Sequence, residues 1–386
     1  MIAFVQPFGL SDGSGGGRIL RSLLKDAPTP FVSVCTSPRP PAPPPFGFQE
    51  HVPKRPYFGR IEHTRFAPLV RWINRPVRQM HARRFRQRLT GLFERLGVTS
   101  VHAIPHGLEF WHAFEVARRL GLRYVLNVHD DMRYNLAGHP QLEEAMKRLG
   151  QVWNRADDRI VISQAMGEAY NERYGHQSYH VITDGLTQLP DRPQQRPTER
   201  IKVYFMGALH LTYHSNFETL TRSLEKLLDD HDVAASLTLR GSPMPSHIAY
   251  SFAVEERPYA PEGEIWKDLQ EIDVLYLPLP FGEEYDPFTR YSMSTKLVTY
   301  LGSGLPIVYH GPAYAAAAQL LARHEAAIIV DSQHPQDLVE GFMHAAEHRE
   351  RIVNHAIELA QERFWMPDQL RRFWSVVGVD REMNAQ

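Results

Sequence analysis

SMSTKLVTYLGSGLPIVYHGP, residues 292–312, follows the apolar segment DVLYLPLP and predicts a short helix between two buried strands. Ser294 is a suitable N-cap, so the helix is expected to begin at Thr295 and Lys296 and to end at Gly302. A lysine in the first turn faces the positive end of the helix dipole, at a cost of up to about 1 kcal/mol. A phosphate at the free backbone amides would remove that conflict. Alternatively, Lys296 is an exposed surface residue and Ser294 only a cap.

The segment as a whole resembles the donor-binding segment of GT-B glycosyltransferases, in particular the large retaining group-1 or family 4 type. Members of that fold commonly show K-x-x-E-Y-L-A-x-G-x-P, where this chain has KLVTYLGSGLP. The resemblance implies two Rossmann-like domains facing each other across a cleft, with a C-terminal helix crossing back to the first. It also implies a hexosyltransferase-like enzyme that moves a sugar from a nucleotide diphosphate donor, such as a UDP-sugar, to an acceptor hydroxyl in glycan, polysaccharide or glycolipid synthesis.

The alternation of strands and helices along the chain independently favours an α/β fold with parallel sheets. Residues 1–190 are expected to form the N-terminal Rossmann-like acceptor domain, with a proline-rich loop and a basic helical segment. The stretch TQLPDRPQQRPTER, residues 187–200, is rich in proline and predicts a linker. Residues 191–362 are then the Rossmann-like nucleotide-sugar domain, and residues 363–386 the returning helix.

The composition is that of a globular protein of two domains, since 386 residues carry 43% hydrophobic and 23% charged side chains. Cys35 is the only cysteine, which excludes an intrachain disulfide and fits a reducing compartment. The N-terminal MIAFVQPFGL has no basic start and a short apolar run, so we expect a buried strand rather than a signal peptide. We therefore expect a cytoplasmic protein, peripheral at the membrane if it binds one.

Charge is distributed unevenly along the chain. Residues 1–190 carry 25 Lys/Arg against 16 Asp/Glu, whereas residues 191–386 carry 18 against 28. Residues 54–95 alone hold 12 Lys/Arg and 2 Asp/Glu. Such a segment suits an anionic membrane surface or a phosphorylated acceptor, and the alternative is a solvated basic face. Nucleic acid is not expected, because no recognised binding module accompanies the charge.

Three glycines, Gly15, Gly16 and Gly17, stand ahead of the first predicted helix. They permit close backbone approach to a ligand, although the spacing does not match a dinucleotide fingerprint. In the resemblance, they match the glycine loop that lies near the sugar and acceptor. The alternative is a plain tight turn.

Two histidines follow parallel strands, where open α/β sheets place their ligands. His106 follows VHAIP and His129 follows RYVLNV. GT-B members often show a V-H-x-H strand end that contributes a histidine near the reacting sugar, and in VHAIPH the match falls on His102 or His106. Alternation along the strand favours His106, outside the strand. Asp130 and Asp131 either act on the acceptor hydroxyl or cap the next helix, and either histidine alone is equally consistent with a structural role.

In the second domain, Gly207 ends the first strand, where the family places a glycine beside the donor phosphates. Many relatives continue with an arginine and a lysine, but this chain reads GALHLTYHSNFETL. Binding of the diphosphate would then rest on Lys296, on Arg240 in LTLRGS and on backbone amides at Ser294 and Thr295. Arg240 is equally compatible with a surface turn.

The paired glutamates typical of the retaining family are missing. Thr299 stands where many relatives carry the second glutamate. Upstream, Glu283, Glu284 and Asp286 in PFGEEYDPF are candidate substitutes, with Glu284 assigned to donor binding, and the alternative is a solvated loop. HDD at residues 129–131 resembles the metal motif of the GT-A fold, but the stronger nucleotide signal lies in a later domain, and no metal or other cofactor is predicted. Two alternatives remain: a nucleotide-sugar epimerase of the same fold, and a non-catalytic nucleotide-sugar binding protein.

Overall fold

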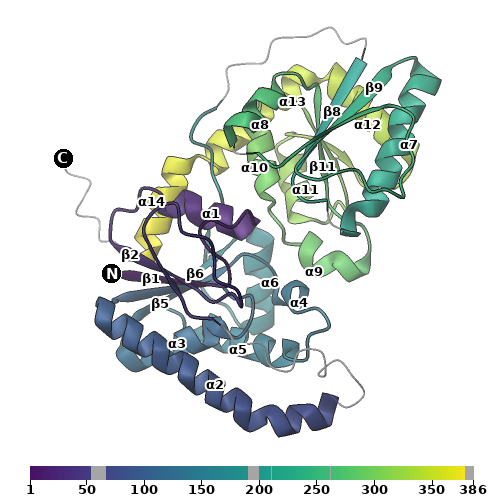
Figure 1. Ribbon diagram of the computed structural model, residues 1–386. Helices are drawn as coiled ribbons and strands as arrows, with labels where there is room; N and C mark the ends of the chain where they lie inside the picture. The colour runs from purple at the N-terminus through teal and green to yellow at the C-terminus, as the bar shows by residue number, and fades with distance from the viewer. Residues whose placement is uncertain (54–66, 190–199, 210, 261, 379–386) are drawn as a thin grey trace, which may run out of the picture. The chain divides into compact units, whose positions relative to one another are not determined.

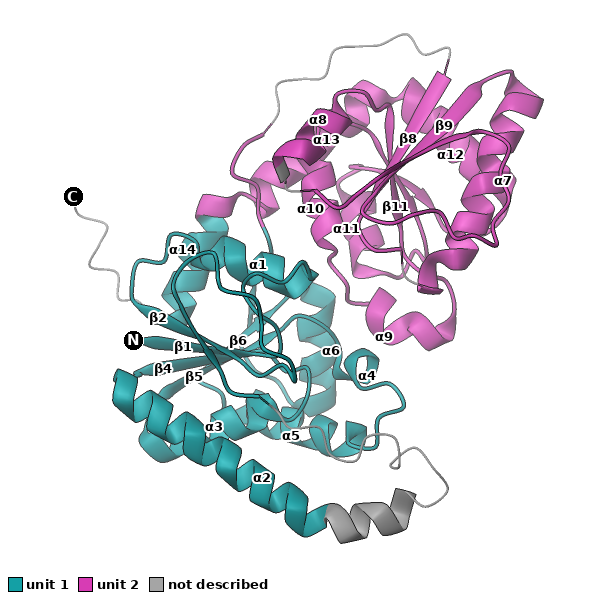
Figure 2. Cartoon of the chain, in the orientation of Figure 1, with its two compact units in different colours: residues 1–184, 368–386 teal, residues 185–367 magenta. Residues whose placement is uncertain are grey.

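The computed structural model describes residues 1–53, 67–189, 200–209, 211–260 and 262–378, in two compact units. Unit 1 comprises residues 1–184 and 368–386, and unit 2 comprises residues 185–367 (Figure 2). Parts of the predicted linker, of the basic segment and of the C-terminal tail lie outside the described residues. No helix within the described ranges is long and apolar enough to cross a bilayer.

The unit boundaries differ from the predicted ones at 190 and 363. The chain leaves unit 1 after Asp184 and returns at Asp368. The segments next to these two points are hydrogen-bonded to each other inside unit 2. The Leu186 N–H donates to Phe364 O at 2.7 Å, and the Met366 N–H donates to Leu186 O at 2.9 Å. The proline-rich stretch therefore does not carry the passage between the units.

Unit 1 is built around a parallel sheet in the order β3-β2-β1-β4-β5-β6-β7. Its strands are β1 (Ile2–Gln6), β2 (Phe31–Cys35), β3 (Phe48–His51), β4 (Ser100–Ala103), β5 (Arg123–Val128), β6 (Asp158–Val161) and β7 (His180–Val181). Its helices are α1 (Gly15–Leu24), α2 (Ala67–Leu96), α3 (Glu109–Leu120), α4 (Met132–Asn135), α5 (Leu142–Arg155), α6 (Gln164–Tyr174) and most of α14 (Met366–Val377). In Figure 1, α1 and α14 lie on one side of this sheet and α3 on the other. Because both faces are covered, β1 and β4 are buried along their whole length.

Unit 2 is built around a second parallel sheet in the order β10-β9-β8-β11-β12-β13. Its strands are β8 (Arg200–Met206), β9 (Ala234–Arg240), β10 (Ala253–Arg257), β11 (Val274–Pro278), β12 (Ile307–His310) and β13 (Ile328–Val330). Its helices are α7 (His214–His231), α8 (Glu262–Leu269), α9 (Asp286–Thr289), α10 (Thr295–Leu301), α11 (Ala316–Arg323), α12 (Pro335–Glu347) and α13 (Arg349–Arg363), with 3-10 turns η2 (Leu211–Tyr213) and η3 (Glu283–Tyr285).

Alternation along β8 builds two cores. Val203 and Phe205 join the core that includes residues of α7 and α12. Tyr204 and Met206 join the opposite core, with residues of α10 and α13. The sheet is therefore covered by helices on both faces, and the predicted α/β class with a second Rossmann-like unit is confirmed.

Each sheet has a point at which the strand order reverses, between β1 and β4 in unit 1 and between β8 and β11 in unit 2. Open α/β sheets bind ligands beyond the carboxyl ends of the strands at such a point. His106 follows β4 and Gly207 follows β8 directly, so both predicted positions lie at these ends.

The predicted return of the C-terminal helix to the first unit is confirmed. The Phe373 ring lies 6.1 Å from the ring of Phe4 in β1 and 5.6 Å from that of His102 in β4. Pro367 lies in the first turn of α14, where its missing N–H costs nothing.

Candidate functional site

The start of α10 is as predicted, and the amides of Lys296 and Leu297 are already bonded within it. The Ser294 hydroxyl accepts a hydrogen bond from the Lys296 N–H at 3.2 Å, and the Ser294 carbonyl accepts one from Leu297 at 2.9 Å. The helix has only seven residues, which limits its dipole. The amides of Lys296 and Leu297 are therefore already used by the cap. Phosphate binding at Ser294 and Thr295 remains a prediction, and the side chain of Lys296 is the feature that the geometry develops further.

The Lys296 amine packs on aromatic rings. The Met206 N–H donates to the Tyr300 hydroxyl at 3.1 Å, which holds α10 against the end of β8. The Lys296 Nζ consequently lies 5.2 Å from the centroid of the Phe205 ring and 5.4 Å from that of Tyr213. Burial against these rings lowers the pKa of Lys296 to about 8. In the part of the chain that the structure describes, no carboxylate pairs with this amine.

Gly207 leaves open backbone next to this amine. Its φ of +102° lies in the region that favours glycine. A Cβ built at this position would lie 3.5 Å from the Lys296 Nζ. The Gly207 N–H donates to Arg240 O at 2.8 Å, which fixes the turn after β8. The structure thus brings Gly207 and Lys296 together, as the sequence predicts.

A second positive feature converges on the lysine. Tyr213, one of the two rings beneath the amine, is the N-cap of α7, an 18-residue helix that has no side-chain cap at this end. The Asn216 Nδ2 donates to Leu279 O at 3.0 Å and to His310 O at 3.1 Å, which pins the first turn of α7 to the ends of β11 and β12. The partial positive charge of a helix N-terminus and a desolvated cation both favour an anion. Sequence reasoning missed α7 here, because no glycine-rich loop precedes it.

In unit 1, His106 and Asp130 lie side by side. The His106 Nε2 is 3.4 Å from the Asp130 Oδ2, and the side chains are 21% and 34% exposed, so a ligand can reach both. Burial lowers the pKa of His106, and the Asp130 carboxylate opposes that shift. Burial raises the pKa of Asp130, and His106 opposes it. Two residues predicted from separate strand ends are thus brought into contact.

His129 belongs to the same cluster but is covered. It is 4% exposed, and burial, with smaller contributions from His106 and His102, lowers its pKa to about 3. A Cβ at Gly16 would lie 3.4 Å from the His129 Nδ1 and 2.9 Å from the Phe8 ring, so the first turn of α1 covers the imidazole. A neutral, covered imidazole suits positioning of its neighbours, and direct action of His129 on the acceptor or sugar remains a prediction.

The three glycines also differ from expectation. Gly15, Gly16 and Gly17 form the first turn of α1 rather than a loop, with the Gly17 N–H donating to the Ser14 hydroxyl at 3.1 Å. At Gly17 a Cβ would lie 2.7 Å from Asp12 O, so close packing accounts for that glycine. Contact of this turn with a sugar or acceptor remains a prediction.

The alternatives left open at two positions are decided by burial. His102 is fully buried in β4, where it accepts a hydrogen bond from the Asn127 Nδ2 at 3.0 Å and packs on Phe4. Asp131 is 1% exposed and caps α4, accepting from the Arg133 N–H at 2.8 Å. His106 and Asp130 are therefore the accessible members of the two pairs.

The sequence matches no family model and no curated protein. Solved structures do resemble this chain. The trehalose-phosphate synthase (UDP-forming) of Burkholderia vietnamiensis superposes with a TM-score of 0.63 at 12% identity, covering 97% of this chain and 98% of the synthase. HepE of Anabaena, in complex with UDP, gives 0.62 at 13% identity, with 97% and 98% covered. TarM of S. aureus gives 0.54 at 13%; 72% of this chain matches, and the match spans about half of TarM, 55%.

The chain has the GT-B fold. With 97% of the chain covered, the likeness extends over both units. At 12–13% identity it concerns the fold alone, and the roles of individual residues have to come from the geometry of this chain.

Arg240 is predicted from the sequence to offset the charge of the donor phosphates. In unit 2, however, its guanidinium is hydrogen-bonded to other groups of the protein. Its Nε and Nη2 donate to the two carboxylate oxygens of Asp268 at 2.6 Å each, and its Nη1 donates to Pro258 O at 2.9 Å. The side chain is only 11% exposed. A guanidinium held by such a bidentate pair has a structural role, so Arg240 is not retained as a donor-binding residue.

Among the described residues, no carboxylate of the kind typical of retaining GT-B enzymes contacts Lys296. Thr299 is buried in α10, and its hydroxyl donates to Thr295 O at 3.4 Å, so the position of the usual glutamate faces the core. Glu284 is exposed in η3, and no contact among the described residues brings it to the lysine. Its predicted role in donor binding remains a prediction.

Within the described ranges, one trio of side chains has the arrangement of a metal site. His344, Glu347 and His348, at the end of α12, offer ligand atoms within 4.8 Å of one another. The trio is on the surface and shares no residue with the Lys296 or His106 clusters. Independence of a metal ion therefore remains a prediction for this GT-B protein.

The lowered pKa of Lys296 predicts how donor binding depends on pH. An anionic ligand binds the protonated amine, so affinity for a UDP-sugar should be constant well below pH 8 and fall as the pH rises above about 8, by up to about tenfold per unit. The diphosphate of a UDP-sugar keeps its charge over this range, but the uracil N3–H begins to titrate at its upper end. The part of the change that Lys296→Arg does not share therefore reports the lysine. Calorimetric titration from pH 6 to about pH 9.5 measures it. A Lys296→Arg variant should show a flatter profile, and a wild-type profile as flat as that of the variant would contradict the assignment.

Proposed function

We propose that this protein is a glycosyltransferase that moves a sugar from a nucleotide diphosphate sugar to an acceptor hydroxyl. The observation that carries the proposal is the Lys296 amine, which has no carboxylate partner among the described residues. Two rings desolvate it, next to Gly207 and to the start of α7, an end without a side-chain cap. An anion such as a diphosphate satisfies both positive features. The UDP-forming synthase and the UDP complex of HepE, which share the fold, support UDP as the nucleotide.

Unit 2 would hold the donor. The ammonium of Lys296 and the amides at the start of α7 offset the negative charge that grows on the leaving diphosphate as the glycosidic bond breaks. Gly207 lets the diphosphate approach the backbone, because it has no side chain. The rings beneath the amine exclude water from one side, which strengthens the electrostatic interaction.

Unit 1 would hold the acceptor. His106 and Asp130 are accessible and adjacent, so they can orient the acceptor hydroxyl and take up its proton. His129 supports this pair from beneath. The proposal includes retention of anomeric configuration, as the resemblance implies. It also includes independence of a metal ion and a cytoplasmic location, for the reasons given from the sequence.

A ligand screen followed by a product assay tests the function. UDP or a UDP-sugar should raise the melting temperature, because a ligand at 100 times its Kd stabilises the native state by about 2.7 kcal/mol. Release of nucleoside diphosphate that depends on an acceptor supports transfer. Interconversion of the sugar without an acceptor would indicate an epimerase, and binding without turnover a non-catalytic protein. If no nucleotide or nucleotide sugar shifts the melting temperature, the proposal fails.

A further inference from the structure

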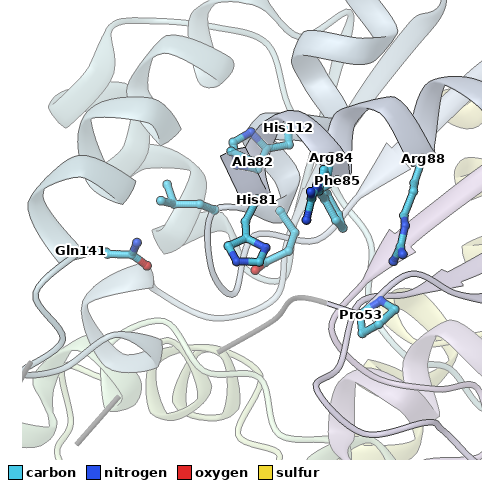
Figure 3. A pocket seen from close by; sticks show the side chains of 10 residues that line it. Pro53, His81, Ala82, Arg84, Phe85, Arg88, His112 and Gln141 are labelled. Atoms are coloured by element: carbon cyan, nitrogen blue, oxygen red, sulfur yellow. The ribbon is translucent and has the colours of Figure 1, made fainter. Parts of the chain in front are cut away.

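Unit 1 contains a pocket formed by α2, the start of α3 and the loop before α5. Its volume is about 110 Å³, and its wall includes His81, Arg84, Phe85, Arg88, Leu108 and Glu109 (Figure 3). A water molecule takes up about 30 Å³ in the liquid, so the pocket can admit a phosphoryl group with part of the molecule that carries it. Phe85 and Leu108 supply an apolar wall for that remainder.

Two cations of the wall have no ion-pair partner among the residues whose side chains the structure describes. Arg84 and Arg88 are exposed, and neither has an ion-pair or hydrogen-bond partner among the residues with described side chains. Arg86, between them on α2, is by contrast paired with Glu115 at 3.1 Å. Like charges four residues apart lie on one side of a helix and destabilise it. An anion bound between Arg84 and Arg88 would attract both guanidinium groups and offset their mutual repulsion.

The remaining polar lining is compatible with an anion. His81, His112 and Gln141 add hydrogen-bonding side chains, with His112 held by Glu115 at 3.2 Å. Glu109 is the one acidic residue of the wall, and it is 9% exposed. The two guanidinium groups therefore outweigh it, and a guanidinium presents the paired N–H groups that fit phosphate oxygens.

The pocket adjoins the candidate acceptor residues. Leu108 and Glu109 follow His106 by two and three residues, so the loop after β4 supplies both His106 and the wall of the pocket. The Glu109 carboxylate is also close enough to His106 to raise the pKa of that histidine, against the larger effect of burial. A molecule anchored in the pocket is thus placed to present a hydroxyl to His106 and Asp130.

We propose that this pocket binds a phosphoryl group on the acceptor, with Arg84 and Arg88 as its ligands. The inference rests on the proposed transferase function and specifies the acceptor class, a phosphorylated alcohol or sugar. The phosphoryl group can belong to a soluble sugar phosphate or to a phospholipid headgroup. Two arginines without a described ion-pair partner in one pocket favour a single bound group over the flat basic face considered from the sequence.

The test uses the full chain with saturating UDP, so that the Lys296 site is filled. Glucose 6-phosphate and glycerol 3-phosphate are titrated by calorimetry, and vesicles containing phosphatidylglycerol are tested by co-sedimentation. The double variant Arg84→Gln, Arg88→Gln should bind at least one probe ten or more times more weakly than the wild type. The matched variant Arg83→Gln removes an exposed arginine of α2 outside the pocket, and it should bind as the wild type does.

The outcomes separate the two proposals. Loss confined to the soluble probes identifies a sugar phosphate, and loss confined to vesicles identifies a lipid headgroup; both support the pocket. Equal binding by the double variant and the wild type would overturn it, as would the absence of binding to every probe while UDP still binds. If the arginines bind a probe and neither UDP nor any nucleotide sugar binds, the transferase function fails and the pocket stands only as an anion site.

Discussion

Replacing Lys296 by methionine should weaken UDP-sugar binding by at least tenfold. A charge-assisted hydrogen bond to phosphate contributes about 1.5 to 3 kcal/mol, and about 1.4 kcal/mol is a factor of ten. Methionine retains an apolar chain over Phe205 and Tyr213 and removes only the charge. Because the wild-type amine is desolvated and pairs with no described carboxylate, the variant should fold with unchanged or greater stability. Calorimetric titration and thermal unfolding measure the two effects.

The matched control for this experiment is Lys226→Met. Lys226 is an exposed lysine of α7 that pairs with Asp230 at 2.7 Å, far along the helix from its N-terminus. Its loss changes the net charge of unit 2 by the same amount and should leave UDP-sugar affinity unchanged. Equal affinities for the wild type and the folded Lys296 variant would remove the basis of the donor site.

Replacing His106 by alanine should lower turnover by about 10² to 10⁴, the usual range for the loss of a general acid or base. Affinity for the UDP-sugar should stay within about twofold, because the proposed donor contacts lie in unit 2. The measurement compares kcat with the donor dissociation constant, using the donor and acceptor found by the screen. His176→Ala, which removes an exposed histidine of the same unit, should change neither quantity.

An alternative result for His106 would be informative. If turnover and donor affinity fall together, or if the variant unfolds at a lower temperature with no specific loss of turnover, the histidine is structural. Asp130→Asn tests the partner, since it keeps the shape of the side chain and removes the charge next to the His106 Nε2. Asp130→Asn should lower turnover. Combined with His106→Ala, it should not raise turnover above that of His106→Ala alone.

Local sequence signals were sufficient for the elements on which the sites are built. Ser294 caps α10 because its hydroxyl reaches an amide two residues away. The apolar runs of β1, β4, β8 and β11 predict strands covered on both faces, and the alternation of these runs with helical segments predicts two parallel sheets. His106 and Gly207 could also be placed at strand ends from the sequence. Gly207 directly follows β8, and His106 lies a few residues beyond the end of β4.

The sequence by itself therefore determined the α/β class, the two Rossmann-like units and which residues stand at the strand ends, since capping and periodicity act over a few residues. Only the tertiary structure decided what each side chain meets. Lys296 is desolvated by the rings of Phe205 and Tyr213, which come from elements about 80 to 90 residues earlier. Arg240 is paired with Asp268, 28 residues later. Burial and charge pairing depend on segments that are distant in the chain. These contacts distinguish Lys296, whose amine pairs with no described carboxylate, from Arg240, whose guanidinium pairs within the fold.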